Sequence, residues 1–174
     1  MQDYASVSGN TVVGDYFYGG GGEGHLGGGG VIVRGGTFIM IDNASVSGNT
    51  SYDQGGGVSV GSYSSGGFGN FTMRDNSSVS GNTAVYGGGV FLFYEVCIFR
   101  ISGGTVFGND SGITDNTALA GAALNWFADG TAQYGTFDGT NWSGLTDIPV
   151  TKGSIGHNKE QIARKRGFGA LGVM

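Results

Sequence analysis

Three short strings of residues recur together along most of the chain, and this repeat limits what the chain can fold into. The first string, Ser-x-Ser-Gly-Asn-Thr, occurs at residues 6–11, 45–50 and 78–83, with a looser copy at 113–117. Its asparagines, separated by 39, 33 and 34 residues, are Asn10, Asn49, Asn82 and Asn116. Self-similarity with a period of this length is typical of repeat architectures.

The other two strings keep a fixed order relative to the first. A Gly-Gly-Gly string that continues as an apolar, mostly Val-x-Val segment occupies residues 28–33, 55–60 and 87–92, with a degenerate copy at 121–126. A Phe-x-Met string occupies residues 38–43 and 71–76 and decays at 99–102. Large apolar residues alternate along both strings, which is the period of a half-buried strand. Each repeat therefore predicts three short strands separated by corners rich in Gly and Asn.

Three short strands cannot bury an apolar face alone, so we expect each repeat to stack on the next, with equivalent strands pairing in parallel about 4.8 Å apart. The predicted fold is all-β: a parallel β-helix (solenoid) of about four coils, each with three short strands. Parallel crossovers favour a right-handed coil. The β-helix repeat domain is expected at residues 1–127, an irregular β or cap region at 128–156, and a basic tail that tolerates a short helix at 157–174.

Composition supports this interpretation. The chain has 39 glycines in 174 residues but only one proline, which excludes a collagen-like chain and a Pro/Gly-rich linker. Gly at the predicted corners provides positive φ angles, and Asn tolerates them. Stacked coils would also place the four asparagines in register, where their amides can bond to one another and satisfy polar groups that cost about 1–3 kcal/mol each when left unpaired.

Charge and cysteine content narrow the class of protein further. Residues 1–150 contain three arginines against twelve acidic residues, 3 − 12 = −9, whereas residues 151–174 carry 5 − 1 = +4. A body this acidic argues against nucleic acid as the main partner. Cys97 is the only cysteine, which excludes an intrachain disulfide. We expect no signal peptide at the start of the given chain and no transmembrane segment, because no apolar run is long enough.

Over residues 3–127, these strings resemble the Gly-Gly-Ala-Ile and Phe-x-x-Asn type repeats of chlamydial polymorphic outer-membrane proteins. They are also similar to the Gly/Asn-rich surface proteins of anaerobic gut and oral bacteria. The chain departs from the first pattern by having Val in place of Ala-Ile after the glycines. The resemblance implies an autotransporter-passenger or adhesin β-helix, displayed outside a bacterial cell or on its surface. It implies no catalytic residues.

An enzyme is the alternative from a different class, since many β-helices cleave polysaccharides with clustered carboxylates, or with carboxylates that hold Ca²⁺ beside an Arg or Lys base. Asp42 and Asp75 occupy equivalent positions in two repeats, with Arg74 beside one of them. A solvated corner where each Asp-Asn pair begins a turn is the favoured interpretation. A Ca²⁺ ion that bridges Asp42 and Asp75 is a weaker interpretation of the same two residues. We therefore expect no catalytic residue, no cofactor and no metal ion beyond that candidate.

The remaining candidates are surfaces. Packing that only stabilises the stack is the favoured interpretation of a set of aromatic residues, and a binding surface for a host or cell-surface glycan or protein is the alternative. These residues are Tyr16, Tyr18, Tyr52, Tyr63 and Tyr86. A single rank of corner threonines leaves ice binding as a further alternative. The lack of a cap at residues 1–11 indicates either a fragment of a longer chain or a subunit that associates head-to-tail with another copy. The basic tail could bind the acidic body of such a copy, and a tail without a role is the alternative. The leading hypothesis is a non-catalytic extracellular structural or adhesive protein, and the alternative is a carbohydrate-active or glycan-binding protein.

Overall fold

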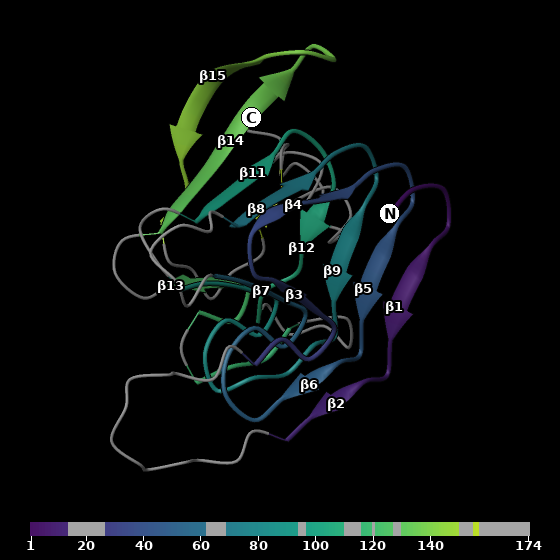
Figure 1. Cartoon of the computed structure of the whole chain (residues 1–174), viewed down its shortest axis with the longest axis vertical. Coiled ribbons are helices and arrows are strands. Elements are labelled where there is room, and N and C mark those ends of the chain that lie inside the picture. Colours follow the sequence, from purple (N-terminus) through teal and green to yellow (C-terminus); the bar gives the residue numbers. More distant parts are fainter. Residues whose placement is uncertain are drawn as a thin grey trace, which may run out of the picture.

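A computed structural model shows that the three recurring strings form three stacks of parallel strands, as Figure 1 shows. The structure describes residues 1–13, 27–61, 69–93, 97–109, 116–119, 121–126, 130–149 and 155–156. The described part of the chain contains strands and no helix. The strands repeat in order about four times, so the predicted parallel β-helix of about four coils is confirmed. The predicted terminal helix at 157–174 lies outside the described residues.

The first stack, which we call the serine sheet, is built from the Ser-x-Ser strings. It contains β1 (Ser6–Ser8), β5 (Ser45–Ser47), β9 (Ser78–Ser80) and β12 (Thr105–Val106), paired in parallel in that order. The register aligns the valines of successive coils, which therefore all point inward: Val7, Val46, Val79 and Val106. β16 (Ile155–Gly156) adds to β12 in the antiparallel direction.

The second stack, the glycine sheet, follows the Gly-Gly-Gly strings. It contains β3 (Val31–Val33), β7 (Val58–Val60), β10 (Val90–Leu92) and β13 (Leu124–Trp126), all parallel. Between the serine and glycine sheets the short strands β2 (Thr11–Val12) and β6 (Thr50–Ser51) also pair in parallel. Bridges from Thr50 to Thr83 and from Thr83 to Thr117 continue that ladder into the later coils.

The third stack, the phenylalanine sheet, follows the Phe-x-Met strings. It contains β4 (Gly36–Met40), β8 (Gly69–Met73), β11 (Ile98–Ile101) and β14 (Thr131–Phe137), all parallel. β15 (Trp142–Asp147) then folds back on β14 in the antiparallel direction. Because β14 pairs with β11, the stack continues past residue 127, where the sequence placed the start of the cap region.

The core lies between the three sheets and is filled from each of them. Phe38, Phe71 and Phe99 stack face to face along the phenylalanine sheet, with ring centroids 5.3 and 4.9 Å apart. Phe71 and Phe99 are fully buried, as are Met40 and Met73 two residues after Phe38 and Phe71. The alternation that predicted one apolar face in these strands therefore identifies the residues that fill the solenoid.

The glycines allow neighbouring coils to approach closely, as the sequence predicted. A Cβ atom added to Gly88 would lie 2.5 Å from the carbonyl oxygen of Thr117 in the next coil, closer than real Cβ contacts allow. Gly48, at a corner, has a φ of +64°. The accompanying asparagines were expected to share this conformation, but they do not. The described non-glycine residues with positive φ are Asp3, Asp42 and Asp75, which lie at a different corner.

Candidate functional site

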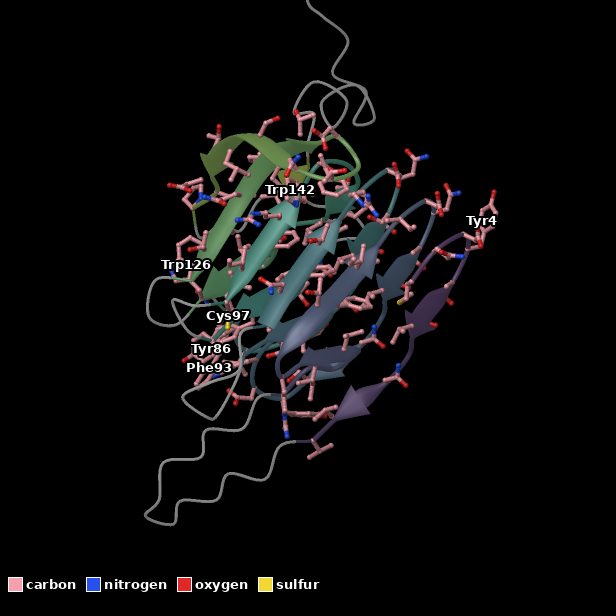
Figure 2. The ribbon with its side chains drawn as sticks, turned by 45° about the horizontal axis from the view of Figure 1, so that its top comes forward. Tyr4, Tyr86, Phe93, Cys97, Trp126 and Trp142 are labelled. Carbon is pink, nitrogen blue, oxygen red and sulfur yellow. The ribbon has the colours of Figure 1, made fainter. Side chains whose placement is uncertain are left out.

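The outer face of the phenylalanine sheet contains a shallow hollow of about 300 Å³. Alternation along β4, β8 and β11 turns short polar and aliphatic side chains outward between the buried Phe and Met residues. The lining consists of Thr37, Ile39, Asn70, Phe71, Thr72, Arg74, Ile98, Arg100, Phe137 and Trp142. The last two come from the hairpin that β14 forms with β15, and Figure 2 shows Trp142 at the upper end of this sheet.

The turn of this hairpin is held by a single carboxylate. Oδ1 of Asp138 accepts hydrogen bonds from the backbone N–H groups of Asn141, at 2.7 Å, and Thr140, at 2.8 Å. These donors, Asn141 before Thr140, lower the pKa of Asp138 below its ordinary value of 3.8, because they favour the ionised carboxylate. Phe137 and Trp142 flank the turn as a cross-strand pair, with ring centroids 5.3 Å apart. Asp138 therefore fixes the part of the hairpin that bears both rings.

Each ring of the pair covers one arginine of the sheet. The guanidinium carbon of Arg74 lies 4.8 Å from the centroid of the Phe137 ring, and that of Arg100 lies 5.9 Å from the Trp142 ring. Both distances are within the range of cation–π attraction. We call the hollow formed around Arg74, Arg100, Phe137 and Trp142 the arginine groove. The face of an aromatic ring covers one side of each of its two guanidinium groups.

The positive charge of the arginine groove is not neutralised by the described part of the chain. Nε of Arg74 is buried and has no hydrogen-bond partner. Nε of Arg100 donates a long hydrogen bond of 3.5 Å to Oε1 of Gln133, whose Nε2 donates to Asp147 at 3.0 Å. No described carboxylate forms an ion pair with either guanidinium. Two of the three arginines of residues 1–150 thus share one hollow on an acidic body.

The four asparagines singled out in the sequence lie in one ladder beside the core. Oδ1 of Asn82 accepts hydrogen bonds from N and Nδ2 of Asn49, both at 3.0 Å, and Oδ1 of Asn116 does the same for Asn82, at 2.8 and 2.9 Å. Asn49, Asn82 and Asn116 are fully buried, whereas Asn10 is exposed at the end of the ladder. Asn10 donates to Asn49 in the same way. Every amide in the ladder therefore stabilises the contact between coils, and the ladder is a structural feature.

Asp42, which is half-buried, and Asp75, which is exposed, form a second ladder. Oδ2 of Asp75 accepts the backbone N–H of Asp42 at 3.2 Å, and Oδ2 of Asp42 accepts that of Asp3 at 3.1 Å. Each carboxylate therefore pairs with the backbone of the preceding coil. No group of three or more His, Cys, Asp or Glu side chains that could hold a metal ion occurs in the described ranges. These backbone contacts fit the turn interpretation of the corner, and the Ca²⁺ candidate stays a prediction.

The predicted tyrosine surface is only partly described, since Tyr16, Tyr18 and Tyr63 lie outside the described residues. Tyr52 and Tyr86 are both exposed, at 59% and 42%. They do not occupy equivalent positions, because Tyr86 pairs with Gln54 of the preceding coil. The coil with Tyr52 has one more residue between its threonine and its glycine triplet, and this insertion moves Tyr52 out of register.

Sequence reasoning missed the arginine groove. It named Arg74 only as a neighbour of Asp75, and it did not single out Arg100, Phe137 or Trp142. The available signal was the phase of the repeat: Arg100 lies between Phe99 and Ile101, which point inward, so it must point outward. The hairpin that brings Phe137 and Trp142 over this face lies beyond the recognisable repeats and gave no such signal.

No protein-family model matches this chain, and no curated protein or solved structure shows significant similarity to it. The similarity to bacterial surface-protein repeats therefore remains an expectation drawn from the sequence. No helix long and apolar enough to cross a membrane is found in the part of the chain that the structure describes.

Proposed function

We propose that this chain is a non-catalytic, extracellular or cell-surface β-helix that acts as an adhesive module and binds its ligand in the arginine groove. The observation that supports this most directly is the pairing of two unneutralised guanidinium groups with two aromatic rings on one open sheet face. Solenoids bind ligands on exposed faces of this kind, while their repeats provide a rigid support. The bacterial surface location rests on the resemblance of the repeats alone.

The alternative, a carbohydrate-active enzyme, has less support from the same geometry. Cleavage of a glycosidic bond generally needs a pair of carboxyl groups at the bond. The lining of the arginine groove contains no Asp or Glu. Asp42 and Asp75, the pair that the sequence offered, use an oxygen each to accept backbone N–H groups at a corner. This arrangement favours binding without cleavage.

Head-to-tail association, the other expectation, is not part of this proposal. A further coil would have to pair in parallel with the last strand of each sheet. β15 already occupies the free edge of β14, and β16 occupies that of β12, both in the antiparallel direction. These two strands prevent regular continuation of the serine and phenylalanine sheets at that end.

A combined adhesion and degradation assay tests the proposal. The protein, immobilised on a surface, is expected to retain cell-surface glycans, and retention is expected to persist in the Asp42→Ala/Asp75→Ala double variant. Incubation with the retained glycan is expected to release no reducing ends. Glycan cleavage that disappears in the double variant would show that the enzyme alternative is correct, and retention of no glycan at all would contradict the adhesive function.

A further inference from the structure

We infer that the arginine groove binds a carboxylated polysaccharide. This inference rests on the proposed function and adds to it the chemical class of the ligand. The charge of the groove favours an anionic ligand. The groove presents two guanidinium groups, with no described carboxylate paired to either, on a chain whose residues 1–150 are otherwise strongly acidic. Neutral ligands would leave these charges unmatched, whereas an anionic ligand pairs with them.

The aromatic rings fix the positions of the two guanidinium groups in a way that suits carboxylates. Phe137 and Trp142 contact the guanidinium groups of Arg74 and Arg100 through their faces. The N–H donors of a guanidinium lie in its plane, so a ring over its face does not occupy them. Nε of Arg74 is buried and Nε of Arg100 donates to Gln133, which leaves the terminal Nη groups of both arginines for a ligand. The planar fork matches the two oxygens of a carboxylate, and a fork already fixed by packing loses little freedom when it binds. The groove is thus prepared for carboxylate groups.

The spacing of the two arginines fits a polymer that carries a carboxylate on successive units. Arg100 pairs in register with Thr72 of the neighbouring strand β8, and Arg74 lies two residues after Thr72, directly beyond the end of that strand. One strand spacing and two residues along the strand separate their Cα atoms by about 8 Å. Two separate carboxylates of one polymer can therefore meet the two forks. A polymer of acidic sugars is expected to bind more tightly than its monomer, because the second contact forms within the same complex.

The position and the lining of the groove favour a polysaccharide over an acidic peptide. The groove lies on the face of a sheet, where backbone groups are already paired between strands, so a peptide cannot add to it as a further strand. Besides Ile39 and Ile98, the lining contains short side chains with hydroxyl or amide groups, namely Thr37, Asn70 and Thr72. Such groups pair with the many hydroxyls of a sugar chain.

The test measures the binding of four defined polymers to the full chain by calorimetry. They are the carboxylated polysaccharide polygalacturonate, the neutral polysaccharide dextran, the sulfated polysaccharide dextran sulfate and the acidic polypeptide polyglutamate. We expect polygalacturonate to bind most tightly and its affinity to fall as salt is raised. Arg74→Gln and Arg100→Gln are each expected to weaken its binding at least about tenfold, the equivalent of about 1.4 kcal/mol.

Arg34→Gln is the matched control, since it removes one positive charge and Arg34 does not line the groove. Its affinity for polygalacturonate is expected to stay within about twofold of the unaltered chain. All three variants are expected to unfold within about 2–4 °C of the unaltered chain, since each loses one surface contact. Arg74→Lys keeps the charge but removes the fork, and it is expected to bind several-fold more weakly. An equal loss in Arg34→Gln would show that overall charge, not the groove, controls binding, and would overturn the inference.

The remaining outcomes separate this inference from the function on which it rests. Equal or tighter binding of dextran sulfate or polyglutamate, with the same dependence on Arg74 and Arg100, would show a general anion site and overturn the choice of a carboxylated polysaccharide. Binding of dextran or of cell surfaces without binding of polygalacturonate would overturn this inference and leave the adhesive function intact. Binding of no polymer and no cell surface would overturn both.

Discussion

Removing one buried amide from the asparagine ladder tests the link between the sequence repeat and the stability of the coils. The side chain of Asn82 makes four hydrogen bonds: its Oδ1 accepts from N and Nδ2 of Asn49, and its Nδ2 donates to Asn116 and to the carbonyl of Val46. A hydrogen bond contributes about 1 kcal/mol net, and a buried group left unpaired costs about 1–3 kcal/mol. We expect Asn82→Ala to destabilise the chain by about 4 kcal/mol.

Asn10→Ala is the matched control at the exposed end of the same ladder. Its side chain donates one hydrogen bond in the ladder, to Oδ1 of Asn49, so its loss is expected to cost about 1 kcal/mol or less. For a chain of this length, 1 kcal/mol corresponds to about 2–4 °C in Tm. Thermal unfolding followed by far-ultraviolet circular dichroism should therefore show a loss of about 8–16 °C for Asn82→Ala and no more than about 2–4 °C for Asn10→Ala. Equal losses in the two variants would refute the argument that burial in the ladder gives the amides their value.

Three further predictions concern backbone approach, the core and the hairpin. Gly88→Ala is expected to prevent folding or to lower the Tm far more than Gly48→Ala does, because the new Cβ at Gly88 meets the Thr117 carbonyl. The new Cβ at Gly48 meets no atom within 4 Å, so that substitution costs only the strain of a left-handed backbone, about 1–2 kcal/mol. Similar Tm values for the two variants would contradict this. Phe71→Ala, in the fully buried middle of the ring stack, is expected to destabilise by about 3–5 kcal/mol in urea unfolding, and a loss under 1 kcal/mol would show that the stack is not the core. The Asp138 carboxylate has a lowered pKa when folded, so its contribution to the hairpin is present above pH 3.8 and is lost as the pH falls through the folded pKa. Tryptophan fluorescence is expected to report this acid transition in the parent chain and a flatter one in Asp138→Asn, and identical profiles would contradict the role of the charge.

The fold was predictable from the sequence because its stabilising contacts repeat with the chain. Val46 and Val79 occupy the same point of two strings and pair directly in the serine sheet, and Phe38 and Phe71 do so in the phenylalanine sheet. A parallel solenoid requires only that equivalent positions of successive repeats meet. The period and the alternation were therefore sufficient to predict the three sheets and the residues that face the core.

The candidate site could not be predicted in the same way, because it depends on contacts that do not repeat. Phe137 and Trp142 belong to an antiparallel hairpin held by Asp138, a pattern found nowhere in the described residues of the earlier coils. A single inserted residue likewise separates the positions of Tyr52 and Tyr86, although both precede a glycine triplet. Where the chain departs from its period, alignment of repeats no longer shows which side chains meet.

The three outer faces of the solenoid differ in what they can offer a ligand, and this difference supports placing the binding site on the phenylalanine sheet. The described outer positions of the serine sheet in the first three coils are serines, whose short side chains form a flat polar surface. On the glycine sheet Ser59 and Phe91 lie at outward positions of their strands, yet their exposed fractions are 0% and 3%, so this part of the face is closed. The phenylalanine sheet combines long cationic side chains, an aromatic hairpin and a hollow on one face. Because the repeated residues of all three sheets serve the packing of the coils, binding specificity must come from the outward positions that vary between coils. Arg74 and Arg100 are the charged residues at such positions that line the groove.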